Sequence, residues 1–165
     1  MSQQQQLFIK IALSTWDTQI KRADKIFNDL SDDQLLADIA PGKNSGAYLL
    51  GHLIVVHDMI LPLFGLGKQL YPSLENTFLT SPDKSGLPFP AVKELRKYWN
   101  DVNSTLATQF SQMQPDDWFQ KHASVSEEDF IKEPHRNRLN VVLNRTNHLS
   151  YHMGQVILLA KTNKE

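Results

Sequence analysis

Three segments of the chain repeat apolar residues at alternating steps of three and four, which is the period of an amphipathic α-helix. They cover residues 9–30, 92–113 and 136–161. A fourth segment, residues 46–65, is apolar almost throughout and follows Ser45, a residue type that favours the N-cap of a helix. No segment shows a convincing strand pattern, so the sequence predicts an all-α fold, a four-helix bundle. The expected core stripes are Ile9, Leu13, Trp16, Ile20, Ala23, Phe27 and Leu30 in the first helix, Val92, Leu95, Trp99, Val102, Leu106, Phe110 and Met113 in the third, and Leu139, Val142, Thr146, Leu149, Met153, Val156 and Ala160 in the last.

The connections between these helices differ in length. Residues 68–90 contain four prolines and no sustained period. A crossover this long lets two consecutive helices run parallel, as some four-helix bundles require. Pro62 is expected to kink or end the second helix and Gly65 to close it, and a second irregular stretch, residues 115–135, precedes the last helix. With 165 residues, the chain is expected to form a single domain over residues 1–165.

Composition excludes several function classes. The 17 basic and 18 acidic residues give a net charge of −1, which argues against a nucleic-acid-binding protein. The apolar second segment contains two histidines, an aspartate and a proline, so we expect no membrane span, and the start of the chain lacks the pattern of a secretory signal. The chain has no cysteine, which excludes disulfides and protein thiolates and fits a cytoplasmic location. A bound metal would therefore need histidine and carboxylate ligands.

Three histidines form the strongest candidate site. His148 and His152 are four residues apart, so on a helix they lie one turn apart on the same side. Such a pair offers two imidazoles to one metal ion. Together with Arg145 and Gln155 they form a polar stripe beside the core stripe. His52 lies in the second helix among leucines, where an unpaired imidazole is costly. The three side chains either bind one ion between two facing helices or hydrogen-bond to neighbouring polar groups inside the bundle.

The segments PGKNSGAYLLGHL and NHLSYHMGQVILLAK resemble the DinB/YfiT-like superfamily of metalloenzymes, and the similarity extends over about residues 7–162. The resemblance implies that His52, His148 and His152 bind one divalent ion, and Gly154–Gln155 matches the ending of the family's HxGQ motif. It also implies an up-down-down-up bundle with a long crossover between the second and third helices. Some relatives activate a small thiol, such as bacillithiol or mycothiol, for transfer to an electrophile, and others isomerise small acids.

The remaining histidines receive other interpretations. Many relatives carry an acidic residue shortly after the histidine of the second helix, where this chain has His57 and Asp58. A step of five residues rotates His57 by about 140° from His52, too far for both to face one ion. We interpret His57 as an outer-sphere or surface residue, with replacement of His52 as ligand the less favoured alternative. His122 and His135 lie in polar irregular segments and are expected to be solvated.

The ligand set suits zinc or nickel, and also iron, manganese or copper. The predicted function is a divalent-metal-dependent enzyme that activates a small thiol or a metal-bound water, and whether the site is catalytic stays open. Helical projection places Tyr48, Arg145, Tyr151 and Gln155 close enough to bind a substrate. The alternative is a non-catalytic bundle in which the ion pins two helices together, acting as a stress-related structural or interaction module. The resemblance and the apolar faces bearing Trp16 and Trp99 also predict a homodimer.

Overall fold

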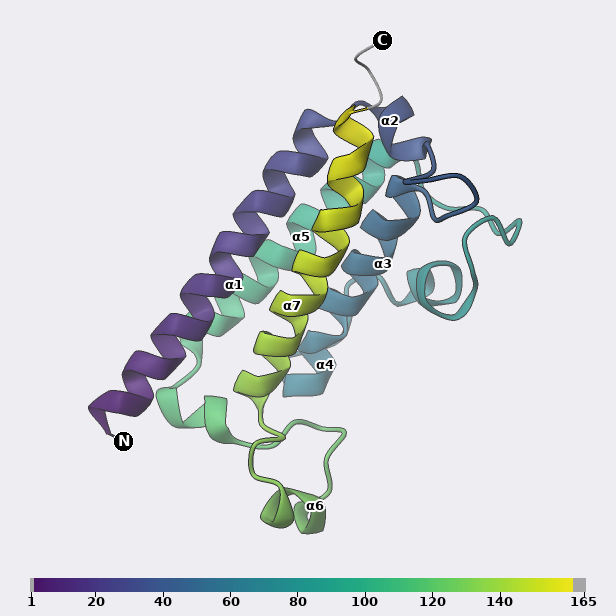
Figure 1. Cartoon of the computed structure of the whole chain (residues 1–165). Coiled ribbons are helices and arrows are strands. Elements are labelled where there is room, and N and C mark those ends of the chain that lie inside the picture. Colours follow the sequence, from purple (N-terminus) through teal and green to yellow (C-terminus); the bar gives the residue numbers. More distant parts are fainter. Residues whose placement is uncertain (1, 162–165) are drawn as a thin grey trace.

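The computed structural model describes residues 2–161, and every regular element in that range is helical. Four long helices form the bundle: α1 (Gln3–Asp29), α3 (Gly46–Asp58), α5 (Val92–Gln112) and α7 (Arg138–Val156) (Figure 1). The shorter elements are α2 (Asp32–Leu36), α4 (Ile60–Phe64), η1 (Pro72–Leu74), η2 (Asn76–Thr80), η3 (Pro115–Phe119), α6 (Glu127–Lys132) and η4 (Ile157–Lys161). The all-α prediction is confirmed.

The helix directions follow the predicted up-down-down-up order. In Figure 1, α1 and α7 run toward the same end of the bundle, and α3 and α5 run the opposite way. Packing agrees with this order, because Phe27 at the end of α1 contacts Trp99 near the start of α5. A Cβ on Gly46 at the start of α3 would meet the side chain of Leu159, which follows α7. The predicted crossover between α3 and α5 therefore returns the chain along the bundle.

Local sequence explains how the second helical segment begins and ends. The hydroxyl of Ser45 accepts the backbone N–H of Tyr48 and caps α3. The segment breaks at Met59, and Pro62 lies in the first turn of α4, where a missing N–H costs no hydrogen bond. Gly65 ends α4 with φ 72°, a conformation that glycine adopts without strain. The predicted break near Pro62 and the stop at Gly65 are both confirmed.

The last helix differs from the prediction at both ends. It begins after Asn137, whose side-chain oxygen accepts the N–H of Asn140, and so starts two residues later than expected. After Val156 the α-helix tightens into the 3₁₀ turn η4, which has about three residues per turn and changes which positions face inward. Leu159 is consequently buried and Ala160 is exposed. The prediction that Ala160 belongs to the core stripe was wrong.

The crossover is attached to the bundle along its length. Both carboxylate oxygens of the buried Asp58 accept backbone N–H groups, from Leu70 at 2.9 Å and Tyr71 at 2.8 Å. Burial raises the pKa of Asp58, against the lowering effect of these two hydrogen bonds. Farther along, the hydroxyl of Tyr48 donates to the carbonyl of Ser81. The crossover is thus an ordered layer on α3.

One helical stretch, Gly46–Phe64, has the length and apolar composition of a membrane-spanning helix. Of its apolar window, 78% is buried inside the bundle. This is the pattern of a core helix, and the structure gives no evidence of a membrane segment.

Candidate metal centre

His52 on α3 and His148 and His152 on α7 converge on one point. The Nε2 atom of His148 lies 3.3 Å from Nε2 of His52 and 3.0 Å from Nε2 of His152. One ring nitrogen from each of the three lies within 4.8 Å of the others, and all three residues are half-buried. Two imidazole nitrogens bound to one tetrahedral ion at about 2.0–2.1 Å would lie roughly 3.3 Å apart. The cluster therefore fits a single divalent ion.

Two of the three rings are oriented by oxygen atoms on their far side. His52 Nδ1 donates to the backbone carbonyl of Phe78 at 2.9 Å. His152 Nδ1 donates to the side-chain oxygen of Gln155 at 2.7 Å, and the amide of Gln155 donates in turn to the hydroxyl of Tyr151. A proton held on Nδ1 leaves the Nε2 lone pair free, and this outer-partner arrangement is typical of metal-bound histidines.

Phe78 reaches His52 from the π-helical turn η2, which packs on α3 beside Gly51. Its ring is fully buried and also contacts Phe89 and Tyr48, with centroid distances of 5.4 Å and 5.8 Å. Single π-helical turns are rare and are frequently found at functional sites. The crossover thus supplies an outer partner of the site, a role that the sequence did not reveal because a backbone carbonyl has no sequence signal.

Burial keeps the imidazoles of His148 and His152 neutral. The pKa of His148 is lowered to about 4, first by burial and then by the positive charges that His152, His52 and Arg145 carry when protonated. The pKa of His152 is also lowered, mainly by burial, although its hydrogen bond to Gln155 acts in the opposite direction. A neutral imidazole is the form that binds a metal ion, so at neutral pH both side chains are ready to do so without losing a proton.

His57 lies outside this cluster, in the centre of the bundle. It is fully buried between the rings of Trp16 and Trp99, with centroid distances of 4.8 Å and 5.1 Å. Its Nδ1 donates to Asn103 at 2.8 Å, and the amide of Asn103 donates to the carbonyl of Trp99. His57 is therefore a core residue that faces α1 and α5, and its interpretation as a surface residue was wrong. Trp16 and Trp99 are likewise buried within the chain, so these two side chains do not themselves offer a dimer contact.

The four residues predicted to bind substrate lie on both helices of the site. Arg145 and Gln155 are half-buried on α7 beside the histidines, and Tyr151 on the same helix is 64% exposed. Tyr48 is buried one turn before His52, with its hydroxyl occupied by Ser81. These positions are compatible with the prediction, and substrate binding stays a prediction for all four.

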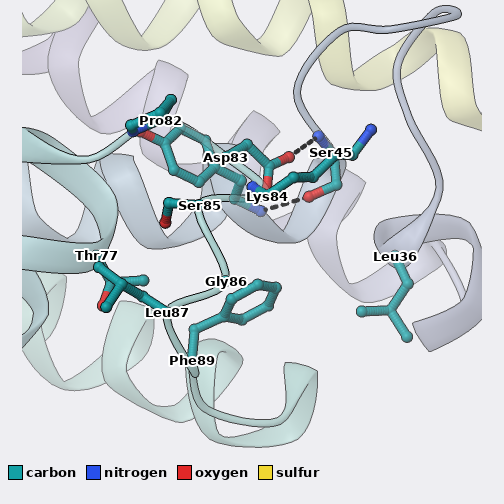
Figure 2. Close-up of a pocket in the computed structure, with 11 residues that line it drawn as sticks. Leu36, Ser45, Thr77, Pro82, Asp83, Lys84, Ser85, Gly86, Leu87 and Phe89 are labelled. Atoms are coloured by element: carbon teal, nitrogen blue, oxygen red, sulfur yellow. Dashed lines mark hydrogen bonds between the residues drawn. The ribbon is translucent and has the colours of Figure 1, made fainter.

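A pocket of about 310 Å³ lies next to Tyr48, between the start of α3 and the crossover. Figure 2 shows Leu36 and Phe89 on its walls and Asp83 pointing toward the backbone of Ser45. The carboxylate of Asp83 accepts the N–H of Ser45 at 2.6 Å, so this carboxylate already has a hydrogen-bond partner at the start of α3. His52, His148 and His152 do not line this pocket.

The two remaining histidines differ from each other. His135 is exposed, as predicted. His122 is half-buried, and its Nδ1 is sealed from solvent with no hydrogen-bond partner within the described range. The prediction that His122 is solvated was therefore wrong, because the backbone of Ala123 bonds to the carbonyl of Leu63 and draws this segment against the end of α4.

The fold and the site together define a four-helix bundle in which two facing helices bring together three imidazoles that could hold one ion. The sequence model of the DinB superfamily matches residues 15–156, a range that contains all three histidines. The chain belongs to the DinB superfamily, as its two motifs predicted. No curated protein matches the chain.

Proposed function

We propose that this protein is a divalent-metal-dependent enzyme that activates a small thiol for transfer to an electrophile. The observation that carries the proposal is the convergence of three Nε2 atoms with two of the rings already oriented from behind. Within residues 2–161, no fourth histidine or carboxylate joins the group. Three protein ligands and an open position are typical of catalytic sites, whereas structural sites are usually closed by four.

The reaction joins the sulfur of the thiol to the electrophile. Zinc or nickel, when bound by the three histidines, supplies the positive charge that ionises a coordinating thiol near neutral pH. The S–C bond forms while the bond to the leaving group breaks, and the thiol proton passes to the solvent. Phe78 and Gln155 keep His52 and His152 in the ligating tautomer throughout. Arg145 and Tyr151, on the same helix as two of the ligands, are the side chains proposed to contact the substrate.

The proposal extends to location and assembly. A chain without cysteine suits the reducing cytoplasm, where we place the protein. We also propose a homodimer, for which the exposed apolar side chains of Leu7, Phe8 and Ile11 at the start of α1 provide a contact surface.

The test uses zinc-loaded and cobalt-loaded protein. Titration of the cobalt form with 2-mercaptoethanol is expected to produce a sulfur-to-metal charge-transfer band. The zinc form should accelerate the reaction of this thiol with chlorodinitrobenzene, in which a C–S bond replaces the C–Cl bond and chloride leaves. His52→Ala should lose the ion, the band and the rate. A protein that binds the ion but gives neither band nor rate would favour the non-catalytic bundle pinned by metal.

A further inference from the structure

Arg145 differs from the other half-buried arginines of the described chain because it has no partner. Arg96 bonds to Asp32 and to two backbone carbonyls, Arg136 bonds to Glu133, and Arg138 bonds to the carbonyl of Asp117. The guanidinium of Arg145 makes no hydrogen bond or ion pair with residues 2–161, and its Nε is sealed from solvent. A half-buried cation without an acceptor is costly, so we expect this side chain to have a partner other than residues 2–161.

The position of Arg145 connects it to the metal centre. It precedes His148 by three residues and His152 by seven on α7, so the three side chains share one side of the helix. All three residues are half-buried. Of the guanidinium nitrogens, only Nε is sealed and unpaired, whereas the two terminal amines stay accessible. The outer edge of the guanidinium is thus free to receive a ligand, on a residue about one helical turn from His148.

The charges around this face favour an anion. The groups that shift the pKa of His148 and His152 include other histidines and Arg145 but no carboxylate. On α3 and the crossover, Asp58 binds two backbone N–H groups and Asp83 binds that of Ser45, and neither carboxylate pairs with Arg145. A divalent ion beside Arg145 would leave the site strongly positive, which attracts a negatively charged ligand.

We propose that Arg145 binds the oxyanion of the substrate, so that the site accepts small acids, most favourably carboxylates. The planar guanidinium fork matches the two oxygens of a carboxylate, and a bidentate pair of this kind fixes both position and orientation. The inference rests on the proposed function, because it places the oxyanion beside the atom that binds the ion. Arg145 then selects which thiol is used.

The experiment compares thiols that differ in one group. Cobalt-loaded protein is titrated with 3-mercaptopropionate and with 3-mercaptopropan-1-ol, and the ratio of the two dissociation constants is determined from the charge-transfer band. The ratio is measured for the natural chain, for Arg145→Gln and for Arg145→Lys. Arg138→Gln is the matched control, because Arg138 is a half-buried arginine on the same helix two turns away. A third thiol, 2-mercaptoethylphosphonate, distinguishes a phosphate-like oxyanion from a carboxylate.

We expect the natural chain and Arg138→Gln to favour the acid over the alcohol, and Arg145→Gln to lose about tenfold or more of that preference. Arg145→Gln should weaken binding of the acid more than binding of the alcohol, with the cobalt content of each variant measured alongside. Arg145→Lys should recover part of the preference, because it restores the charge without the fork. If Arg145→Gln does not fold, the test is whether Arg145→Lys prefers the acid less strongly than the natural chain does.

If the ratio of the two dissociation constants is unchanged in folded Arg145 variants, the role of Arg145 is refuted. If the charge-transfer band is still seen in that case, the proposed function is unaffected. A natural chain that binds cobalt but neither thiol overturns both. A stronger preference for the phosphonate, lost in Arg145→Gln, would keep the oxyanion site and change the substrate class to a phosphate ester.

Discussion

The ring of Phe78 lies so close to the backbone of Gly51 that a Cβ added at Gly51 would meet two ring carbons at 2.3 Å. Gly51 directly precedes His52, and the carbonyl of Phe78 accepts the Nδ1 proton of that histidine. The missing side chain at position 51 therefore allows η2 to approach α3 closely enough to orient His52.

Gly51→Ala should weaken metal binding. The new methyl group would push η2 away and lengthen the hydrogen bond between His52 and Phe78, and overpacking of this kind costs roughly 1–3 kcal/mol of stability. Loss of an outer partner typically lowers metal affinity about 10- to 100-fold. Competition with a chromophoric chelator measures the affinity. Gly154→Ala is the control, because a Cβ at this helical glycine meets nothing within 4 Å. Equal affinities in the two variants would contradict the role of Gly51.

His148→Ala and His152→Ala should each abolish stable metal binding, because two imidazoles do not hold the ion as three do. Elemental analysis after dialysis should give about one ion per chain for the natural protein and close to none for either variant. His135→Ala, at an exposed histidine far from the cluster in sequence, should retain the ion. A natural chain that takes up neither zinc nor nickel would remove the basis of the proposed function.

Gln155→Ala tests the second oriented ring. Without the amide oxygen, nothing on α7 fixes the Nδ1 proton of His152, so we expect a loss of roughly tenfold in metal affinity with little change in folding. Tyr151→Phe removes only the hydroxyl to which Gln155 donates at 3.3 Å and should have a smaller effect. A larger loss in Tyr151→Phe than in Gln155→Ala would contradict the role of Gln155 in orienting His152.

The stability of the metal-free protein should fall as the pH is lowered below about 6.5. Burial lowers the pKa of His57 to about 3, so between these values the unfolded chain binds a proton that the folded chain does not. Each pH unit in this interval costs about 1.4 kcal/mol for one such group, or roughly 2 kcal/mol at pH 5. Urea unfolding at pH 7 and pH 5 measures the fall.

His57→Gln is the matched variant for this measurement, because glutamine offers a hydrogen bond to Asn103 but does not titrate. It should be less stable than the natural chain at pH 7 and should lose less stability on acidification. His148 and His152, whose pKa values are also lowered, contribute the part of the fall that remains. The same loss in both proteins would exclude His57 as a cause.

Light scattering at tens of micromolar tests the homodimer. We expect the mass of two chains, and a shift toward one chain when Leu7 and Ile11 are both replaced by Glu, because charges would then enter an apolar contact. Ile131→Glu is the control, since Ile131 is the more exposed at 81% but lies on α6. A single-chain mass for the natural protein would refute the dimer.

Spacing along a helix was sufficient to predict the fold and the pairing of His148 with His152, and the resemblance to the DinB superfamily added His52 to the candidate site. The three- and four-residue steps predicted the long helices, the prolines predicted the crossover, and the four-residue step joined His148 to His152. The last turn of the chain could not be predicted in this way. The tightening into η4 that buries Leu159 depends on packing against α2 and α3.

The surroundings of the histidines could not be predicted for a different reason. His57 is buried by Trp16 and Trp99, which come from two other helices and stand more than forty residues away in either direction. The partner of His52 comes from the crossover, twenty-six residues later. Contacts of this kind depend on how helices and loops pack in three dimensions, and no pattern of neighbouring residues predicts them.

The oxygen that orients His52 belongs to the main chain of residue 78. Every amino acid has that carbonyl, so no substitution at position 78 deletes the acceptor. A change there alters the shape of the side chain and thereby the distance at which the peptide group lies from α3. Substitutions of Phe78 would therefore change the length of the hydrogen bond to His52, and with it the metal affinity, by degrees. Substitutions of Gln155 would either keep or remove the hydrogen bond to His152.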